Sequence, residues 1–523
     1  MLIVGAGPVG LVLAIALGQA GVRCTLVERK DAPQFLPKME RCNARTMEIF
    51  RRMGIVDRVR AAGLRADVPM DVYIVLALNR PPLLHHAYPS VDEARREIDA
   101  CEDGTLPLEP YQLISQYTLE PLLKSIAESL PTVTVRYGCE FLAFEQNASS
   151  VKTKIKSKDQ TFEIQSQYLV GCDGGGSAVR QQLGIELRGD GNLLKFRQAL
   201  YRCDELFDRM PIDGGPGHGR HYHVADDKAT FLIMQDSTKH WTLHATLDRD
   251  EDMARQFEIT VGVPVKYEML YVGEWKQNLL LADRYGKGRV FLAGDAVHLV
   301  VPTGGLGMNS GVGDAVDLAW KLAGALQGWG GPKLLAYYET ERRQVGERNV
   351  AASRYASQGR RKWRGLWRNL DELVAVAEVE QRKSNEMIGA ELGYRYAGSP
   401  IISEEPGGPE HLFREYVPSS WPGARLPHVW LEGHQAIQDR IGGGYTLLRL
   451  GKSSENLDSF VEAFQIRNAP FQILDIPDRN ARDLYGFDLI LLRPDLHVVW
   501  RGNRAHPAPR ELAALATGQA MPR

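Results

Sequence analysis

Short apolar runs recur along the chain, and the clearest of them end at a glycine or an acidic residue just before a helical pattern. Residues 2–4 lead into a glycine-rich turn, residues 24–27 end at Glu28, and residues 290–293 precede a helical pattern over 312–326. Runs this short and this apolar indicate strands buried on both faces, as in a parallel sheet. Strands that alternate with helices predict an α/β fold with a Rossmann-like sheet.

Two stretches alternate polar and apolar residues instead. Residues 132–169 predict a meander of four strands, and residues 196–283 predict an antiparallel sheet inserted into the α/β domain, one face of which is free to roof a substrate pocket. Helical patterns follow over 334–350, and the basic-rich stretch 354–368 is expected on a solvated helix face. Residues 398–409, rich in Gly, Pro and Glu, predict a linker before a small C-terminal α/β domain.

The composition narrows the class of protein. A chain of 523 residues with a formal net charge of −2 is typical of a soluble protein of two or three domains, and it gives no reason to expect nucleic acid as a partner. No apolar run is long enough to span a membrane. Six scattered cysteines, with none after Cys203, suit a reducing cytoplasm. The histidines stand at no metal-ligand spacing, so we expect no metal site. The first predicted strand is short at its amino end, from which we expect that the natural or cloned start of the chain has been trimmed.

The turn after the first strand carries the pattern G-x-G-x-x-G. It reads Gly5-Ala6-Gly7-Pro8-Val9-Gly10, and Glu28 ends the next strand. In this context Gly5 makes the tight turn, Gly7 lets a pyrophosphate approach the helix start, and Gly10 packs the helix on the strand. The carboxylate of Glu28 would accept hydrogen bonds from ribose hydroxyls. The pattern therefore predicts dinucleotide binding, without distinguishing NAD from FAD.

Two more strand ends carry a carboxylate before a glycine-rich loop. Asp173-Gly174 is one, and Gly294-Asp295 is the other, with a loop that runs on from Pro302 to Asn309. Unpaired N–H groups at a helix start, together with the helix dipole, make a seat for an anionic or electron-rich group. The glycines of this loop let the backbone approach a flat ring without a Cβ clash.

Two polar residues outside these loops are further candidates for the cofactor site. Arg41, just ahead of a helical pattern, can neutralise a pyrophosphate, and a solvated charged face is the alternative. Gln116 can bond a cofactor edge, and a polar residue at a helix start is the alternative. In the inserted sheet we expect four residues to serve as hydrogen-bonding wall groups for an aromatic substrate. They are Tyr222, His223, Gln235 and His244.

These motifs, in this order, resemble the class A FAD-dependent aromatic hydroxylases, a group that includes the phenol and p-hydroxybenzoate hydroxylases. The resemblance covers about residues 1–350. The stretch 416–428, with Arg493-Pro494-Asp495 and Trp500-Arg501-Gly502, resembles the thioredoxin-like tail of the longer branch, which includes phenol, 3-(3-hydroxyphenyl)propionate and polyketide hydroxylases. This tail lacks cysteine, so we expect it to serve packing or homodimer contacts rather than dithiol chemistry.

The resemblance implies a single-component monooxygenase that uses FAD, NADPH or NADH as transient co-substrate, and O₂ to hydroxylate a phenolic or related aromatic substrate through a flavin C4a-hydroperoxide. It implies that Pro302 places its carbonyl over the flavin and substrate as the catalytic residue. The residues it implies for FAD are Gly5, Gly7, Pro8, Val9, Gly10, Glu28, Arg29, Arg41, Gln116, Asp173, Asp295, Gly305, Leu306, Gly307, Met308 and Asn309. A non-oxygenating flavin-binding protein, or another FAD oxidoreductase of the same fold, is the alternative.

The same reading divides the chain into segments of a p-hydroxybenzoate hydroxylase-type fold. The FAD-binding domain is expected over 1–70, 111–195 and 284–350, and the substrate domain over 71–110 and 196–283. A helical connector over 351–400 then leads to a thioredoxin-like domain over 401–523.

Overall fold

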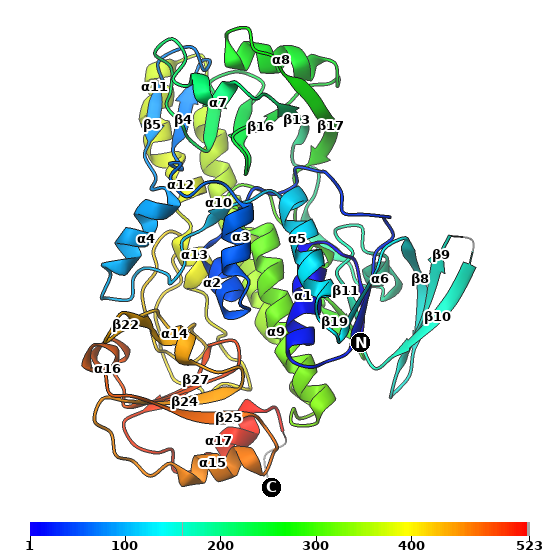
Figure 1. Ribbon diagram of the computed structural model, residues 1–523, viewed down its shortest axis with the longest axis vertical. Helices are drawn as coiled ribbons and strands as arrows, with labels where there is room; N and C mark the ends of the chain where they lie inside the picture. Colours follow the sequence, from blue (N-terminus) through cyan, green and yellow to red (C-terminus); the bar gives the residue numbers. More distant parts are fainter. Residues whose placement is uncertain (159, 520–523) are drawn as a thin grey trace.

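The computed structural model describes residues 1–158 and 160–519, and its first sheet begins at the amino terminus (Figure 1). This six-stranded sheet has the order β19-β20-β11-β1-β2-β7. Its strands are β1 (Leu2–Val4), β2 (Cys24–Val27), β7 (Val133–Arg136), β11 (Leu169–Gly171), β19 (Gly286–Lys287) and β20 (Val290–Leu292). All neighbours pair in parallel except β19, which is antiparallel to β20. The loops that follow β1, β2, β11 and β20 therefore meet at one edge of the sheet.

Helix α1 (Pro8–Gln19) packs against two other helices, α5 (Gln116–Glu128) and α9 (Gly307–Gln327). A helix that is apolar on nearly every side is stable only when other elements cover those sides. Helix α9 is longer than the sequence pattern predicts, because its first turn is formed by the glycine motif itself, ahead of the amphipathic stretch 312–326. The glycine loop and the helix are thus one continuous unit.

Strands β8 (Cys139–Gln146), β9 (Val151–Ser157) and β10 (Gln160–Ser166) form an antiparallel sheet at the side of the α/β domain (Figure 1). In β9 the buried positions alternate with exposed lysines, which is the signature of a sheet with one solvated face. The predicted meander over 132–169 is thus divided, since its first strand, β7, belongs to the parallel sheet and its other three strands form the antiparallel sheet.

A seven-stranded sheet of order β17-β13-β16-β15-β14-β4-β5 lies apart from the first sheet, at the top of the view in Figure 1. Its strands are β4 (Val72–Val75), β5 (Leu84–His86), β13 (Lys195–Arg202), β14 (His221–Val224), β15 (Phe231–Met234), β16 (His240–Ala245) and β17 (Glu268–Lys276). The pairing is antiparallel except between β4 and β14, which run parallel. Residues 71–110 therefore contribute two strands to the sheet that residues 196–283 build.

Helix α10 (Tyr337–Arg364) is one continuous helix that connects the α/β domain to the seven-stranded sheet (Figure 1). The prediction of a solvated basic end is wrong for Arg364, whose Nη1 donates to the Ala229 carbonyl at 2.7 Å. The reason is tertiary: Trp363 is fully buried under α11 (Leu370–Glu380), and this fixes which face of the helix end meets the sheet. Lys362 remains on the solvated face, as predicted.

The C-terminal domain contains a four-stranded sheet of order β25-β24-β26-β27, with β24 and β25 parallel and the other pairs antiparallel, as in thioredoxin-like domains. Its elements are β24 (Tyr445–Leu450), α15 (Asp458–Gln465), β25 (Phe471–Ile476), α16 (Arg479–Tyr485), β26 (Leu489–Leu492), β27 (Val498–Gly502) and α17 (Pro509–Ala516). The last four residues of the segment predicted over 401–523 lie outside the described residues.

Within the described residues no helix is both long and apolar enough to cross a bilayer. Shorter elements connect the sheets and long helices. They are β3 (Arg41–Cys42), α2 (Ala44–Arg52), α3 (Val56–Ala62), α4 (Val91–Asp99), β6 (Gln112–Leu113), α6 (Ala178–Gln182), β12 (Leu187–Asp190), α7 (Leu206–Arg209), α8 (Asp252–Val261), β18 (Leu279–Ala282), η1 (Gly294–Ala296), β21 (His298–Leu299), α12 (Arg382–Asn385), α13 (Ile388–Leu392), β22 (Trp430–Leu431), β23 (Gln435–Ala436) and α14 (Ile437–Arg440).

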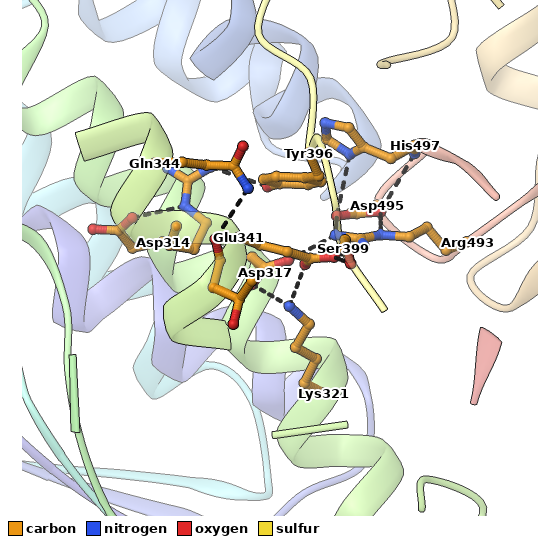
Figure 2. Close-up of polar contacts among 12 residues, drawn as sticks. Asp314, Asp317, Lys321, Glu341, Gln344, Tyr396, Ser399, Arg493, Asp495 and His497 are labelled. Carbon is orange, nitrogen blue, oxygen red and sulfur yellow. Dashed lines mark hydrogen bonds and ion pairs between the residues drawn. The ribbon is translucent and has the colours of Figure 1, made fainter. Parts of the chain in front are cut away.

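A buried network of charged side chains joins α9 and α10 to the C-terminal domain (Figure 2). Arg493 bonds Glu341 at 2.6 Å, Asp317 at 2.8 Å and Asp495 at 2.7 Å. Lys321 donates to Asp317 at 2.7 Å and to Glu341 at 2.5 Å. Burial raises the pKa of Asp317, whereas the Arg493 and Lys321 charges outweigh burial and lower the pKa of Glu341. The domains are therefore joined by groups that each need the others to remain charged.

We expect Arg493→Met to destabilise the whole chain by about 3–5 kcal/mol, because it leaves three buried carboxylates without their shared cation. The shift of the urea unfolding midpoint measures this loss. Arg510→Met is the matched control, since the Arg510–Glu462 pair is 65% and 57% exposed and should contribute less than about 1 kcal/mol. Equal midpoints for the two variants would show that the buried network does not hold the domains together.

Candidate cofactor site and substrate cavity

The turn between β1 and α1 leaves open space in front of its backbone at one glycine only. A Cβ at Gly5 would lie 2.4 Å from the Cys172 carbonyl oxygen, and the φ of Gly5 is +104°. A Cβ at Gly10 would lie 2.0 Å from the Gly5 carbonyl oxygen, whereas at Gly7 no atom lies within 4 Å. Gly5 and Gly10 thus allow the turn to close on itself, and Gly7 leaves the helix start accessible to a ligand.

Glu28, at the end of β2, is held beside this turn by backbone N–H groups. Its Oε2 accepts from the Ala6 N–H at 2.9 Å, and its Oε1 accepts from the Lys30 N–H at 3.0 Å. A carboxylate has capacity for further hydrogen bonds after accepting these two, so a hydroxyl-bearing ligand can still bond to it. The neighbouring Arg29 side chain is exposed.

Asp173, after the end of β11, accepts hydrogen bonds from the start of α6, whose N-cap residue is Ser177. Its Oδ1 accepts from the Ser177 hydroxyl at 2.5 Å, and its Oδ2 accepts from the Val179 N–H at 3.3 Å. Burial raises the pKa of this carboxyl group above its usual value. Arg180, in the same helix, donates to the Ala296 carbonyl at 3.1 Å. This contact connects the loop after β11 with the loop after β20.

The loop after β20 is fixed by a carboxylate from α9. Gly294 has a φ of +65°, its N–H donates to Asp314 Oδ2 at 3.0 Å, and a Cβ there would lie 2.9 Å from Val9. The next residue, Asp295, has an exposed side chain, yet the surrounding protein desolvates it enough to raise its pKa. Asp295 is thus an accessible carboxyl group on a rigid turn.

The glycine loop before α9 is closed by internal hydrogen bonds. The Gly305 N–H donates to the Pro302 carbonyl at 2.9 Å. Asn309 donates from Nδ2 to the Gly305 carbonyl at 2.6 Å, and its Oδ1 accepts from the Asn43 N–H at 2.9 Å. Leu306 is fully buried, whereas Gly307 and Met308, in the first turn of α9, are partly exposed. The loop therefore presents a short, ordered stretch of backbone.

The two polar candidates outside the loops are both occupied by protein groups. Arg41 donates from Nη2 to the Gly304 carbonyl at 2.7 Å and lies 3.6 Å from Glu391, so its charge supports the glycine loop. Gln116 lies at the start of α5 and donates from Nε2 to Glu120 at 2.5 Å. It is partly exposed.

The parallel pairing of β1, β2, β11 and β20 brings four features to one edge of the sheet. They are the turn after β1, Glu28, Asp173 and the loop that carries Asp295. The open turn at Gly7, the acceptor Glu28 and the accessible Asp295 match the needs of a dinucleotide: N–H donors for a pyrophosphate and carboxylates for hydroxyl groups. The ordered glycine backbone before α9 adds a surface for a flat ring. The residues present therefore fit a bound FAD.

A cavity of about 290 Å³ lies between the seven-stranded sheet and the end of α10. Aromatic side chains supply much of its wall, and charged groups and the glycine loop supply the rest. Its lining includes Phe196, Phe231, Trp275, Trp367, Arg360, Arg361, Arg364, Asp226, Asp227, Pro302 and Thr303. The cavity thus adjoins the predicted catalytic residue Pro302.

The four predicted wall residues do not line this cavity within the described part of the chain. Tyr222 lies in the core on the other face of the sheet, where its hydroxyl donates to the Gly217 carbonyl at 3.0 Å. His244 stacks on Phe231 behind the cavity wall, and His223 bonds the Arg364 side chain at 3.0 Å. Gln235 is buried, and its Oε1 has no hydrogen-bond partner among the described residues.

A buried pair that sequence reasoning did not find is His221 with Glu40, joined at 2.8 Å. Burial, with Arg220 nearby, lowers the pKa of His221 to about 4, and His221 and Arg220 outweigh burial to lower the pKa of Glu40. The partners are 181 residues apart in the chain, so no local pattern could have revealed the pair. Within the described residues no cluster of three or more possible metal ligands is present.

Comparison with known proteins supports this picture. Residues 1–353 match the family described as an FAD binding domain, and residues 419–519 match the aromatic-ring hydroxylase C-terminal family. The chain is 32% identical to the FAD-dependent monooxygenase apdD of Emericella nidulans, over 99% of this chain and 90% of that protein. It is 31% identical to the aklavinone 12-hydroxylase RdmE of Streptomyces purpurascens, over 97% and 95%. The structure of the rebeccamycin biosynthetic enzyme RebC with reduced flavin superposes with a TM-score of 0.89 at 30% identity, covering 99% and 98% of the two chains.

We expect Gly7→Ala to weaken FAD binding by at least about tenfold, because its Cβ would enter the space that a pyrophosphate needs. The fold should be unaffected, since no protein atom lies within 4 Å of that Cβ and the φ of Gly7 is −69°. Titration of FAD into the apoprotein measures the affinity, and a thermal melt without FAD checks the fold. Gly443→Ala is the control, because a Cβ there also meets no atom within 4 Å. Equal FAD affinity in both variants would show that the pyrophosphate does not bind at this turn.

Proposed function

The chain belongs to the family of FAD-dependent aromatic-ring hydroxylases, and from that premise we propose which of its residues carry the reaction. It is a monooxygenase that uses FAD and acts on a small aromatic substrate. When bound, FAD supplies the two-electron redox chemistry between NAD(P)H and O₂ that such hydroxylases use. The tasks of the protein are to hold FAD, to orient the substrate and to exclude water.

In our proposal the pyrophosphate of FAD lies at the start of α1, against the N–H groups of Gly7, Val9 and Gly10. The carboxylates of Glu28 and Asp295 accept hydrogen bonds from its hydroxyl groups. The flat ring lies against the backbone of residues 305–309, where the N–H groups at the start of α9 stabilise negative charge on it. Arg41 contributes by fixing the Gly304 carbonyl. Arg29, Gln116 and Asp173 complete the proposed set.

The aromatic substrate would occupy the cavity between the seven-stranded sheet and α10. Once a substrate fills the cavity, its ring against the aromatic walls would displace water, which favours oxygenation over loss of activated oxygen to solvent. Pro302 lines the cavity and also belongs to the glycine loop, so it lies where substrate and flavin meet. His223, His244 and Gln235 act from behind the wall, and Tyr222 acts from the opposite face of the sheet, by fixing its packing.

Four finer points belong to the same proposal. NADPH or NADH donates the electrons without a nucleotide-binding domain of its own, since no second G-x-G-x-x-G follows a strand. O₂ is the second substrate.

The protein works in the cytoplasm, where its cysteine thiols stay reduced; five of the six are buried. The C-terminal domain supports α9 and allows a homodimer. A non-oxygenating flavoprotein would leave the cavity beside Pro302 without a role.

The observation that carries this proposal is the position of Pro302, which joins the glycine loop to the aromatic cavity. The purified protein should be yellow and should oxidise NAD(P)H faster when phenols or naphthols are added. With ¹⁸O₂ the hydroxylated product should carry one ¹⁸O atom per molecule, as mass spectrometry would show. Retention of FAD without stimulated NAD(P)H oxidation by any aromatic compound would overturn the proposal in favour of the non-oxygenating alternative.

A further inference from the structure

The cavity beside Pro302 is lined by arginines that have no carboxylate partner. Arg360, Arg361 and Arg364 all contribute to its wall. Within the described residues none of the three lies within 4 Å of an acidic side chain, whereas most arginines that are fully buried are paired, as Arg425 is with Glu48. Arg360 and Arg364 are partly buried, and Arg361 is exposed. Partial burial of a cation without an acidic partner costs folding free energy, so Arg360 and Arg364 are candidates for binding an anion.

Arg360 is the clearest case, because its hydrogen-bonding groups are unused. Its side chain makes no hydrogen bond within the described part of the chain, and its Nε is buried without a partner. Its Cζ lies 5.8 Å from the centre of the Phe231 ring, so the guanidinium lies against the aromatic wall. Burial lowers its pKa to about 10, so it stays charged at neutral pH. The guanidinium is thus a positioned cation with free donors.

Arg364 adds a second charge beside Phe231 and is held in place by neutral groups. It donates to the Ala229 carbonyl at 2.7 Å and contacts the His223 ring at 3.0 Å, and its Cζ lies 5.2 Å from the Phe231 ring. Neither partner carries a negative charge, so neither neutralises the guanidinium. Burial lowers the pKa of His223 and keeps that ring uncharged, able to accept a hydrogen bond.

The acids nearest to these arginines are already engaged. Glu40 is bonded to His221. Asp226 lines the cavity, but its carboxylate accepts from the N–H groups of Lys228 and Thr230 and from Gln256. Asp227 also lines the cavity and is exposed. Three arginines and two carboxylates therefore line the cavity, and the more buried carboxylate, that of Asp226, already accepts hydrogen bonds from other groups.

We propose that Arg360, supported by Arg364, binds a carboxylate on the aromatic substrate, so that the enzyme prefers an aromatic acid to its neutral analogue. This inference rests on the proposed function, because it takes the cavity beside Pro302 as the substrate site. A planar guanidinium binds a carboxylate through two parallel hydrogen bonds, and the rings of Phe196, Phe231 and Trp275 pack on the aromatic part.

The test compares two probes, 6-hydroxy-2-naphthoate and 6-hydroxy-2-naphthamide, which differ mainly in charge. Binding is followed in the purified holoenzyme by quenching of tryptophan fluorescence, since Trp275 and Trp367 line the cavity. No turnover is needed, so failure of hydroxylation and failure of this inference give different results. The wild-type protein should bind the acid about tenfold to a hundredfold more tightly than the amide, the range expected for a charge-assisted hydrogen bond.

Arg360→Gln should remove this preference by weakening binding of the acid alone. Arg360→Lys should keep part of it, because a lysine retains the charge but not the two parallel bonds. Lys362→Gln is the matched control on the same helix, since its side chain is 64% exposed and pairs with Glu380 at 3.0 Å. FAD content and the thermal midpoint check that each variant folds.

Three results would overturn the inference. The first is that the wild-type protein binds the acid and the amide equally. This comparison needs no variant, so it tests the inference even if Arg360→Gln fails to fold. Arg360→Gln could weaken both probes equally, which would indicate a packing role. It could also raise the KM for NAD(P)H and leave the binding of both probes unchanged, which would assign the arginine to the nucleotide.

Discussion

Desolvation of the Asp314 carboxylate is the constraint on which the site depends most directly. This side chain is fully buried, and it can stay charged only because Arg342 bonds it at 2.8 Å and His298 at 2.8 Å. Its remaining capacity accepts the Gly294 N–H, which fixes the turn that presents Asp295. The parallel sheet brings the loop after β20 close to α9, and the hydrogen bonds of the Asp314 carboxylate then fix the geometry of that loop.

The same arrangement continues into the C-terminal domain, which gives that domain a physical role despite its lack of cysteine. Arg342 also bonds the Tyr396 hydroxyl at 3.0 Å, and Arg493 bonds Asp317 and Glu341 (Figure 2). Four buried carboxylates, those of Asp314, Asp317, Glu341 and Asp495, thus face three fixed cations, those of Lys321, Arg342 and Arg493. Burial, with Glu341 and Asp495 close by, raises the pKa of Asp317, and Arg493 of the C-terminal domain is one of the two cations that oppose this rise.

The substrate side of the molecule depends on a different element, the long helix α10. Its first turns belong to the charged network and its last turns carry Arg360 and Arg364 to the aromatic face of the seven-stranded sheet. One rigid helix therefore connects the support of the cofactor loop with the wall of the substrate cavity. Phe231 illustrates the coupling, because it lines the cavity, stacks on His244 and lies beside both arginines.

The sequence alone determined the α/β class, the positions of the strand ends and the family. Gly5, Gly7 and Gly10, with Glu28, Asp173 and Asp295, are local signals, since each depends on the backbone geometry of a strand end and its next few residues. A chain without cysteine after Cys203 likewise excluded dithiol chemistry in the C-terminal domain. These features could be read from short stretches because their physical cause is local.

Only the tertiary structure decided which side chains face the substrate and which support the fold. The period of a strand shows that Tyr222 and His223 point to opposite faces, but not which face meets α10. The charged residues of the stretch 354–368 predicted a solvated helix face at the end of α10. In the structure the burial of Trp363 turns Arg364 toward the sheet instead. The pairs His221–Glu40 and Arg493–Glu341 join residues 181 and 152 positions apart, and such pairing depends on packing that no local pattern contains.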